Sequence, residues 1–347
     1  QPEVHLIPKA LRAIVDLAAP AVLLKAEAIV PTHDLPPYLG GGENPGQECH
    51  LAYHSSLMAS AWASLAEDNA ELVCEVLRNT PSVPAHTGWV SYVRCHDEIV
   101  WNLLGPDMEQ LGFDFPTRIR HIADRLEGHG ADAFGRGDPF QPGADGSVRG
   151  SNGMTAALTG FQHAVNATER KAALQRFKLL YGLCFSVGAV PLIFMGDECL
   201  LGNNESAADA ARCKADGRWL QRPYFDPSRY EPTGFPDSPP AQAFNWLRGM
   251  AEQRRQLAGL DPLAPIHLLD CEDPAVLLLQ RGERFLAIMN FSSHPVTLHP
   301  PAWSCTTLAE GLWIDVLAPI SDPPPLDPTA ATVTLAPWAM HWLHKQS

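Results

Sequence analysis

Acidic residues follow three apolar runs in this sequence, each at the point where a buried strand would end. They are Glu27 after Ala21–Leu24, His96-Asp97-Glu98 after the run that begins at Trp89, and Asp197-Glu198 after the run that begins at Val190. Hydrolysis of a glycosidic bond uses two carboxyl groups. One gives a proton to the leaving oxygen, and the other attacks or stabilises the cationic sugar carbon. In a barrel of alternating strands and helices the carboxyl ends of the strands meet at one pocket, so these acids would face one another across a substrate.

Each of these acids also has a plainer interpretation. An acid just after a strand often caps the next helix or pairs with a basic residue in a loop, and it then has no part in catalysis. For Asp197 and Glu198 we expect a structural pairing role beneath the pocket. The pattern alone leaves open whether the chain is a glycosidase or another α/β protein, because a fold does not fix a function.

The spacing of apolar residues predicts the elements that position these acids. A helix from near Lys9 stops before Pro20, and the run Ala21–Leu24 then predicts a fully buried strand. The same unit recurs as a helix that ends near Gly188 and a buried strand over Val190–Met195. The apolar positions that mark the two helices are Leu11, Ile14, Val15 and Ala18, and Leu174, Phe177, Leu180 and Tyr181. Hydrophobic strands that alternate with helices are typical of a parallel sheet covered on both faces, which predicts an α/β fold.

The pattern changes in the last part of the chain. Ala275–Gln280 and Arg284–Phe291 are predicted strands joined by a short Arg-Gly-Glu turn, and Thr332–Leu343 alternates with a period of two. This pattern predicts a small antiparallel β domain. Residues 103–165 contain turn motifs such as Gly135-Arg136-Gly137-Asp138-Pro139, which predict an inserted, loop-rich subdomain.

Composition excludes several classes of function. The net charge of -14 argues against nucleic-acid binding, which needs Lys and Arg to neutralise phosphates. No apolar run is long enough to span a membrane. The eight cysteines are scattered without metal-ligand spacing, so we expect reduced thiols in a cytoplasmic protein and no metal or organic cofactor.

Several stretches resemble the α-amylase superfamily, glycoside hydrolase family 13, and within it most resemble the amylosucrase and sucrose hydrolase branch. The stretches are Lys25–Val30, Gln47–Tyr53, His86–Ile99, Pro191–Glu198 and Gly217–Pro223. The resemblance implies a chain that corresponds to the C-terminal half of a (β/α)8 TIM barrel, with strands 5 to 8, followed by an antiparallel β-sandwich. The implied ranges are 1–102 for barrel strands 5 to 7, 103–165 for the insert, 166–260 for strand 8 and the final helices, and 261–347 for the β domain.

The resemblance also assigns roles to residues. Glu27 corresponds to the general acid/base and Asp97 to the acid that stabilises the transition state. His96 and Arg218 correspond to residues that hold the glucosyl ring of the substrate. The residues that correspond to the fructose side of the pocket are Ile29, Glu48, Glu98, Arg118 and Arg149.

One catalytic group of the family has no counterpart in this sequence. The family carries its nucleophilic aspartate on a Gly-Phe-Arg-x-Asp type strand upstream of the acid/base strand. It also has an earlier Asp-x-x-x-Asn-His block, and neither pattern occurs here. Four strands cut from a closed barrel would also expose two apolar edges. We therefore expect an N-terminal barrel half, as a separate chain or segment, to complete the fold.

The resulting hypothesis is a sucrose-acting retaining α-glucosidase that forms a glucosyl-enzyme and passes the glucosyl group to water or to a glucan. The alternative is a catalytically incomplete fragment with only a sugar-binding or structural role. This sequence differs from the amylosucrase branch at two places that correspond to the side of the pocket where the acceptor of the glucosyl group binds. They are Glu98 where amylosucrases tend to have aspartate, and the glycine-rich loop Gly40–Gly46 before Glu48.

Overall fold

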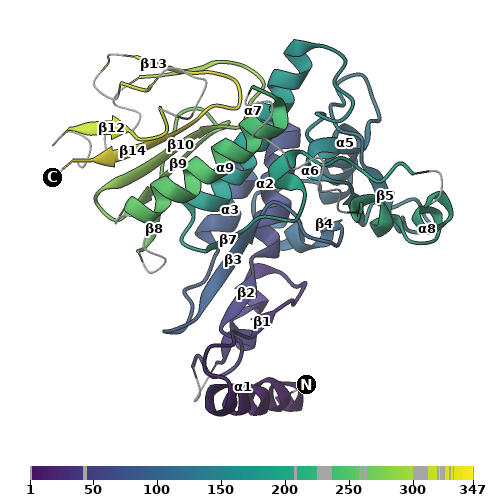
Figure 1. Ribbon diagram of the computed structural model, residues 1–347, viewed down its shortest axis with the longest axis vertical. Helices are drawn as coiled ribbons and strands as arrows, with labels where there is room; N and C mark the ends of the chain where they lie inside the picture. The colour runs from purple at the N-terminus through teal and green to yellow at the C-terminus, as the bar shows by residue number, and fades with distance from the viewer. Residues whose placement is uncertain are drawn as a thin grey trace.

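The computed structural model describes residues 2–41, 45–206, 209–224, 237–257, 260, 264–299, 312–318, 320, 325–327, 330 and 332–346. The predicted loop Gly40–Gly46 therefore lies partly outside the described residues, at 42–44. Figure 1 shows a parallel sheet near the N-terminus, a smaller subdomain beside it and an antiparallel sheet formed by the C-terminal residues, with long helices between the two large sheets.

The helices are α1 Leu6–Ala18, α2 Ser55–Glu67, α3 Glu71–Arg78, α4 Gly105–Gln110, α5 Phe115–Glu127, α6 Thr155–Leu158, α7 Ala167–Ser186, α8 Ala210–Ala215 and α9 Pro239–Gln256. The strands are β1 Lys25–Ala26, β2 Leu51–Tyr53, β3 Gly88–Tyr92, β4 Ile99–Val100, β5 Asp138–Phe140, β6 Gly150–Asn152, β7 Val190–Leu192, β8 Ile266–Leu269, β9 Val276–Arg281, β10 Phe285–Asn290, β11 Val296–Leu298, β12 Trp313–Asp315, β13 Val333–Leu335 and β14 Met340–Lys345.

The parallel sheet has the strand order β1-β2-β3-β7, so β1 and β7 are its edges. Helix α2 packs at the end of β3, where the indole of Trp62 donates to the carbonyl of Val93, the residue after the strand, at 2.7 Å. Helix α7 packs on the same strand, since the Ser91 hydroxyl donates to the Cys184 carbonyl at 2.8 Å. The predicted alternation of helices with parallel strands is confirmed.

The prediction of full burial is wrong at both edges of this sheet. Strand β1 begins at Lys25, and Leu23 in the preceding apolar run is 61% exposed. On the other edge, Val190 is 47% and Met195 is 51% exposed. An apolar run is buried only where neighbouring elements cover it, and neither edge strand pairs with another strand on its outer side among the described residues.

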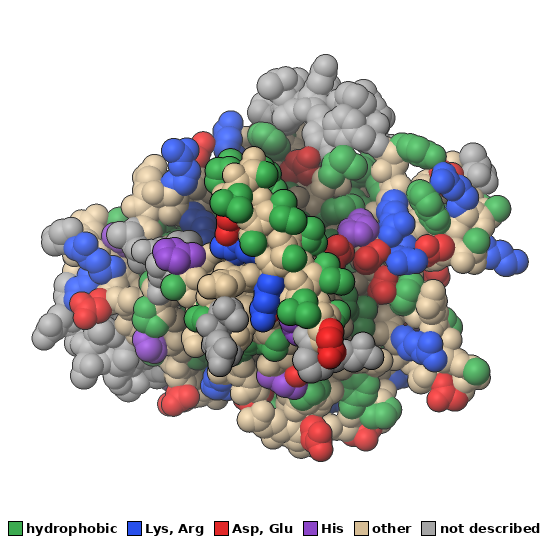
Figure 2. All heavy atoms as spheres, turned by 90° about the horizontal axis from the view of Figure 1, so that it is seen from below, with side chains coloured by type: hydrophobic (Ala, Val, Ile, Leu, Met, Phe, Trp, Pro, Cys, Tyr) green, Lys and Arg blue, Asp and Glu red, His purple; other side chains and the backbone are tan. Residues whose placement is uncertain are grey.

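Helix α1 confirms the predicted period but buries none of its residues. Its apolar side chains Leu6, Ile7, Leu11, Ile14 and Leu17 are between 50% and 88% exposed. Figure 2, seen from the side of α1, shows these hydrophobic side chains along the helix. Arg12 attaches α1 to the rest of the chain, because its guanidinium donates to the carbonyls of Gly46 and Glu48 at 3.1 Å. We call the five apolar side chains the open face of α1.

The subdomain beside the sheet contains the antiparallel strands β4, β6 and β5 in that order. Because β4 begins at Ile99, this sheet starts before residue 103, where the insert was predicted to begin. Helix α5 packs against β6 through Glu127, which accepts a hydrogen bond from the Ser151 hydroxyl at 2.6 Å. Burial raises the pKa of Glu127 to about 7, and the Ser151 hydrogen bond partly opposes that rise.

The raised pKa of Glu127 predicts a pH-dependent stability. A carboxyl with a folded pKa of about 7 and an ordinary value of 4.5 binds more protons in the folded than in the unfolded chain between these values. The free energy of unfolding should therefore fall as pH rises through this window, by up to about 3 kcal/mol, and level off above it. Urea unfolding at pH 5 and pH 7.5 would measure this.

The variant Glu127→Gln removes the titrating group, and its stability should lose most of this pH dependence. Glu109→Gln, which changes an exposed acid of α4, is the matched control. If Glu127→Gln kept the same difference between pH 5 and pH 7.5 as the unchanged protein, the assignment to Glu127 would be wrong.

The C-terminal residues form a five-stranded antiparallel sheet of order β12-β14-β10-β9-β8 and a ribbon of β11 and β13. The predicted hairpin is confirmed as β9 and β10, which turn at Gly282. Both faces of these strands are covered. Leu277 and Leu279 pack into the core shared with α7 and α9, whereas Val276 and Leu278 pack towards the ribbon.

The single alternating strand predicted over Thr332–Leu343 is two strands in different sheets. Strand β13 pairs with β11, and β14 lies between β10 and β12. The break falls at Pro337, which cannot donate to a strand partner, and at Trp338, whose φ of +52° turns the backbone out of the extended region.

None of the helices in the described ranges is both long and apolar enough to span a membrane. The cysteines in those ranges are free thiols, which fits the predicted reduced state, and Cys305 lies outside the described residues.

Candidate active site

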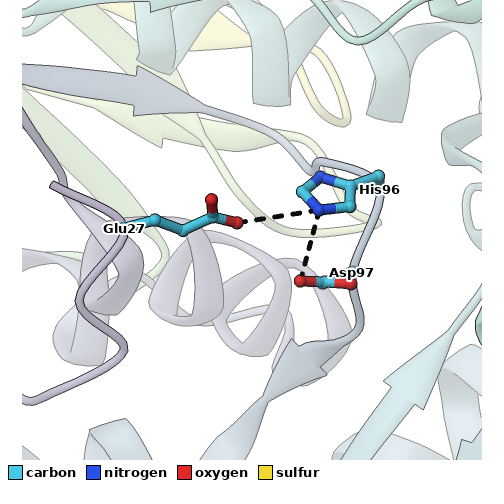
Figure 3. Close-up of side chains that lie close together, drawn as sticks. All are labelled: Glu27, His96 and Asp97. Carbon is cyan, nitrogen blue, oxygen red and sulfur yellow. Dashed lines mark ion pairs between the residues drawn. The ribbon is translucent and has the colours of Figure 1, made fainter. Parts of the chain in front are cut away.

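Glu27, His96 and Asp97 come together at one end of the parallel sheet. Glu27 follows β1, and His96 and Asp97 follow β3, so all three lie at the carboxyl ends of their strands. The imidazole Nε2 of His96 lies 3.7 Å from Glu27 Oε1 and 3.5 Å from Asp97 Oδ2, and Figure 3 shows both acids directed at this ring. One oxygen of Glu27, the His96 nitrogen and one oxygen of Asp97 all lie within 4.8 Å of one another.

A small cavity of about 40 Å³ opens beside these side chains. Glu27, Asp97 and Glu98 line it together with Ile29 and apolar or aromatic residues such as Tyr53 and Tyr92. Tyr53 accepts a hydrogen bond from Lys25 Nζ at 2.5 Å, which fixes the phenol at the wall. The cavity therefore combines carboxyl groups with aromatic surface, as a sugar site requires.

Glu98 differs electrostatically from the other two acids of the cavity. Burial raises its pKa, and the charge of Asp97 adds to the rise. Its Oε2 is buried without a hydrogen-bond partner among the described residues. The unpartnered oxygen of Glu98 is therefore available to hydrogen-bond a bound molecule.

Two arginines hold Asp97. Arg222 Nη2 donates to Asp97 Oδ1 at 2.8 Å, and its Nε donates to the His96 carbonyl at 3.0 Å. Arg218 Nη1 lies 3.5 Å from the same Asp97 oxygen. The Nε and Nη2 of Arg218 donate to Asp216 at 2.9 and 3.0 Å, which lowers the pKa of Asp216.

Sequence reasoning named Arg218 and missed Arg222, although Arg222 makes the shorter contact with Asp97. A signal was present, because Arg222 lies within the same quoted stretch, four residues after Arg218. Local sequence does not say which of two nearby arginines reaches an acid more than a hundred residues away.

The atoms of Glu27, His96 and Asp97 are close enough together to bind one cation. The side chains of Glu27 and His96 are 47% and 50% exposed, and the two arginines compete with a cation for Asp97. These features argue against a metal site here.

Comparisons with known proteins show what this chain is similar to. No family model matches the chain. Trehalose synthase/amylase TreS of Mycobacterium tuberculosis is 31% identical over 103 residues, which are 30% of this chain and 17% of that protein. Glucosylglycerate phosphorylase of Escherichia coli is 26% identical over 204 residues, which are 59% of this chain and 33% of that protein. The chain therefore matches a third or less of the length of these curated relatives.

Solved structures share the fold. AmyP in complex with maltose superposes with a TM-score of 0.63 at 11% identity, covering 98% of this chain and 62% of that chain. Sucrose 6F-phosphate phosphorylase from Thermoanaerobacter thermosaccharolyticum gives a TM-score of 0.59 at 14% identity, covering 84% of this chain and 52% of that chain. Together the relatives and the structures support the α-amylase superfamily. They do not single out the amylosucrase branch.

Of the residues nominated by resemblance to this superfamily, the structure brings six together. Glu27, Ile29, Asp97 and Glu98 line the cavity, and His96 and Arg218 contact its acids. Three others lie elsewhere.

Glu48 lies at the end of the parallel sheet opposite to the cavity. It precedes β2 whereas Glu27 follows β1, and parallel strands place these positions at opposite ends. Glu48 is 1% exposed, and its carboxylate lies 2.8 Å from His5 Nδ1 and 3.8 Å from Lys9 Nζ. The structure thus gives Glu48 a role in attaching the N-terminal helix.

Arg118 and Arg149 also lie away from the cavity. Arg118 makes a two-pronged ion pair with Glu67, at 2.7 and 2.9 Å, and stacks on Phe113. Arg149 is exposed and lines a separate hollow beside Phe115. The guanidinium of Arg118 is thus bound by Glu67 and Phe113. Arg149 directly precedes β6 and therefore lies on another surface.

Proposed function

We propose that this chain carries the acid/base side of the active site of a retaining enzyme that breaks the α-glucosidic bond of sucrose. The enzyme then transfers the glucosyl group to water or to a glucan. The observation that supports the proposal best is that Glu27 faces His96 and Asp97 across the carboxyl end of a parallel sheet. In (β/α) barrel enzymes this end of the sheet carries the catalytic residues.

Each residue of the site has a chemical role in this proposal. Glu27 gives its proton to the oxygen of the departing fructose and later takes a proton from the attacking water or sugar hydroxyl. Asp97 accepts hydrogen bonds from glucosyl hydroxyls, and Arg222 fixes the carboxylate that does so. His96 supports the same ring. Glu98 and Ile29, which also line the cavity, contact the departing fructose.

The nucleophile is proposed to come from outside the residues of this chain. The acids that line the cavity are Glu27, Asp97 and Glu98. Asp97 lies close enough to Glu27 for a retaining pair, whose carboxyls stand roughly 5 Å apart. One of its oxygens, however, is held by Arg222 and approached by Arg218, which suits a group that orients hydroxyls better than one that attacks carbon.

We propose that an N-terminal barrel half supplies this nucleophile and covers the open edges of the sheet. Strands β1 and β7 are both free on their outer sides among the described residues, and apolar side chains on both edges and on the open face of α1 are exposed. In this proposal residues 1–102 and 166–260 form barrel strands 5 to 8, 103–165 form the insert, and 261–347 form the β domain.

A second candidate is phosphorolysis, in which inorganic phosphate accepts the glucosyl group. The match with glucosylglycerate phosphorylase covers more of this chain than the match with TreS, and a sucrose 6F-phosphate phosphorylase shares the fold.

Product analysis with the intact protein distinguishes these reactions. Sucrose, trehalose and glucosylglycerate are each supplied with and without inorganic phosphate, and glucose, fructose and glucose 1-phosphate are measured. We expect fructose release from sucrose in both conditions. Equal glucose indicates hydrolysis, a fructose excess without phosphate indicates glucan synthesis, and phosphate-dependent glucose 1-phosphate indicates phosphorolysis. If a correctly folded protein releases no product from any donor, the chain belongs to a sugar-binding or structural protein instead.

A further inference from the structure

Arg94 and Asp197 are charged residues buried beneath the site. Arg94 is 1% exposed and lies two residues before His96, and Asp197 is 0% exposed and lies in the segment after β7. Burial raises the pKa of Asp197, and the nearby positive charge of Arg94 opposes this rise. Burial also lowers the pKa of Arg94, and the charge of Asp197 opposes this change. Each residue is therefore the charge that compensates the other.

The contacts of these two residues join four segments of the fold. Asp197 Oδ2 accepts hydrogen bonds from the Thr155 hydroxyl at 2.6 Å and from the Tyr181 phenol at 2.5 Å. The Arg94 guanidinium lies over the Phe194 ring at 4.6 Å, and its Nη1 lies 3.3 Å from the sulfur of Met154. Strand β3, helix α6, helix α7 and the segment after β7 thus meet at one buried charge pair.

The pair is close but not in direct contact. Their charges interact, but no ion pair of 4.0 Å or less joins Arg94 and Asp197 among the described residues. The Nη2 of Arg94 and the Oδ1 of Asp197 are buried without a hydrogen-bond partner in the described part of the chain. Removal of one member would leave the other as an isolated buried charge, which destabilises a protein far more than removal of both.

This arrangement is coupled to the site along the backbone. Only Cys95 separates Arg94 from His96, so the guanidinium and the imidazole are carried by the same tight segment after β3. On its other side, Gln221 accepts from the Gly153 amide at 2.7 Å and donates to the His96 carbonyl at 3.4 Å. The segment that contains His96 and Asp97 is therefore fixed at two places. The buried side chain of Arg94 anchors its start, and Gln221 and Arg222 hydrogen-bond to the His96 carbonyl.

We propose that Arg94 and Asp197 are positioning residues that set the orientation of His96 and Asp97, and that they act as a pair. This inference rests on the proposed function for its effect on turnover, but not for its effect on the geometry of His96. Neither residue lines the cavity. Their influence on the substrate would pass through the segment that they hold.

Three variants test the pair in the intact protein. Arg94→Leu and Asp197→Leu each leave one buried charge, and the double variant leaves none. We expect each single variant to lower kcat for sucrose by at least about tenfold with a smaller change in KM, because small misplacement of orienting groups costs mainly transition-state stabilisation. The double variant should recover part of that loss. Glu198→Gln, in the adjacent acid whose carboxylate accepts from the Gly196 amide, should keep the original kcat.

The ring signals of His96, followed by NMR with carbon-labelled histidine at one pH, give a readout that needs no turnover. They can be assigned with a His96→Gln variant. We expect their chemical shifts to move in both single variants and to return towards the original values in the double variant. If folded single variants keep the His96 chemical shifts and the kcat of the unchanged protein, the pair has only a structural role and the inference is wrong. If no protein is active but the His96 signals move, the proposed function fails and the positioning role stands.

Discussion

Replacing Glu27 by Gln should lower the rate of fructose release from sucrose by about 100- to 10,000-fold, the range that general acid/base catalysis contributes. The amide keeps the shape of the side chain but has no proton to give to the leaving oxygen. With α-glucosyl fluoride, whose leaving group needs no protonation, the variant should form the glucosyl-enzyme at close to the original rate. Because breakdown of the glucosyl-enzyme also uses Glu27, the release of fructose and of fluoride must be compared within the first turnover, by rapid mixing.

The control is Glu283→Gln, which changes an exposed acid at the β9–β10 turn, far along the chain from the site. It should leave both rates unchanged. An equal loss of first-turnover rate with sucrose and with the fluoride in Glu27→Gln would contradict the acid/base role, because the defect in forming the glucosyl-enzyme would then not depend on the leaving group. Mass spectrometry of enzyme trapped with a fluorinated glucosyl donor would identify the nucleophile, and labelling of Asp97 would overturn the proposal that it lies elsewhere.

Replacing Leu11 and Ile14 by Lys on the open face of α1 should destabilise the intact protein by about 3–6 kcal/mol, if an N-terminal barrel half covers these side chains. They are 50% and 59% exposed in the structure described here. Burial of a leucine or isoleucine side chain is worth about 1.5–3 kcal/mol, and a buried Lys adds an unpaired charge. Urea unfolding of the intact protein would measure the change.

A matched substitution distinguishes burial of the open face by a companion segment from a general effect of placing Lys on the surface. Leu312→Lys changes a leucine that is 62% exposed, beside β12 and outside the open face. It should change the free energy of unfolding by no more than about 0.5 kcal/mol, as is usual for exposed positions. If the double variant on α1 behaved like Leu312→Lys, the open face would be in contact with water in the intact protein, and the proposed companion would not cover it.

The sequence predicted most accurately those features that depend on neighbours along the chain. Period and flanking residues predict a helix from near Lys9, which the structure has over Leu6–Ala18, and the hairpin of β9 and β10, because backbone hydrogen bonding and turns are local. The acids after β1 and β3 were also predicted to meet, since strand direction alone brings carboxyl ends together.

Features that depend on distant partners could not be predicted in this way. Amphipathic spacing shows that α1 has an apolar face but not whether anything covers it. Arg118 was assigned to the site, yet Glu67 takes up its guanidinium from another helix. The pairing of Arg222 with Asp97 likewise arises only when the segment after β7 folds back over the end of β3.

The position of β14 in its sheet affects how the chain is made. This strand lies between β10 and β12, although it is the last strand in sequence among the described residues. While the ribosome is still translating the segment after β10, strand β10 is paired with β9 on one side only. The backbone amide and carbonyl groups on its other side, which later pair with β14, are unpaired. Such an edge invites pairing with other nascent chains. Chaperone binding during translation should therefore concentrate on the interval between the emergence of β10 and that of β14.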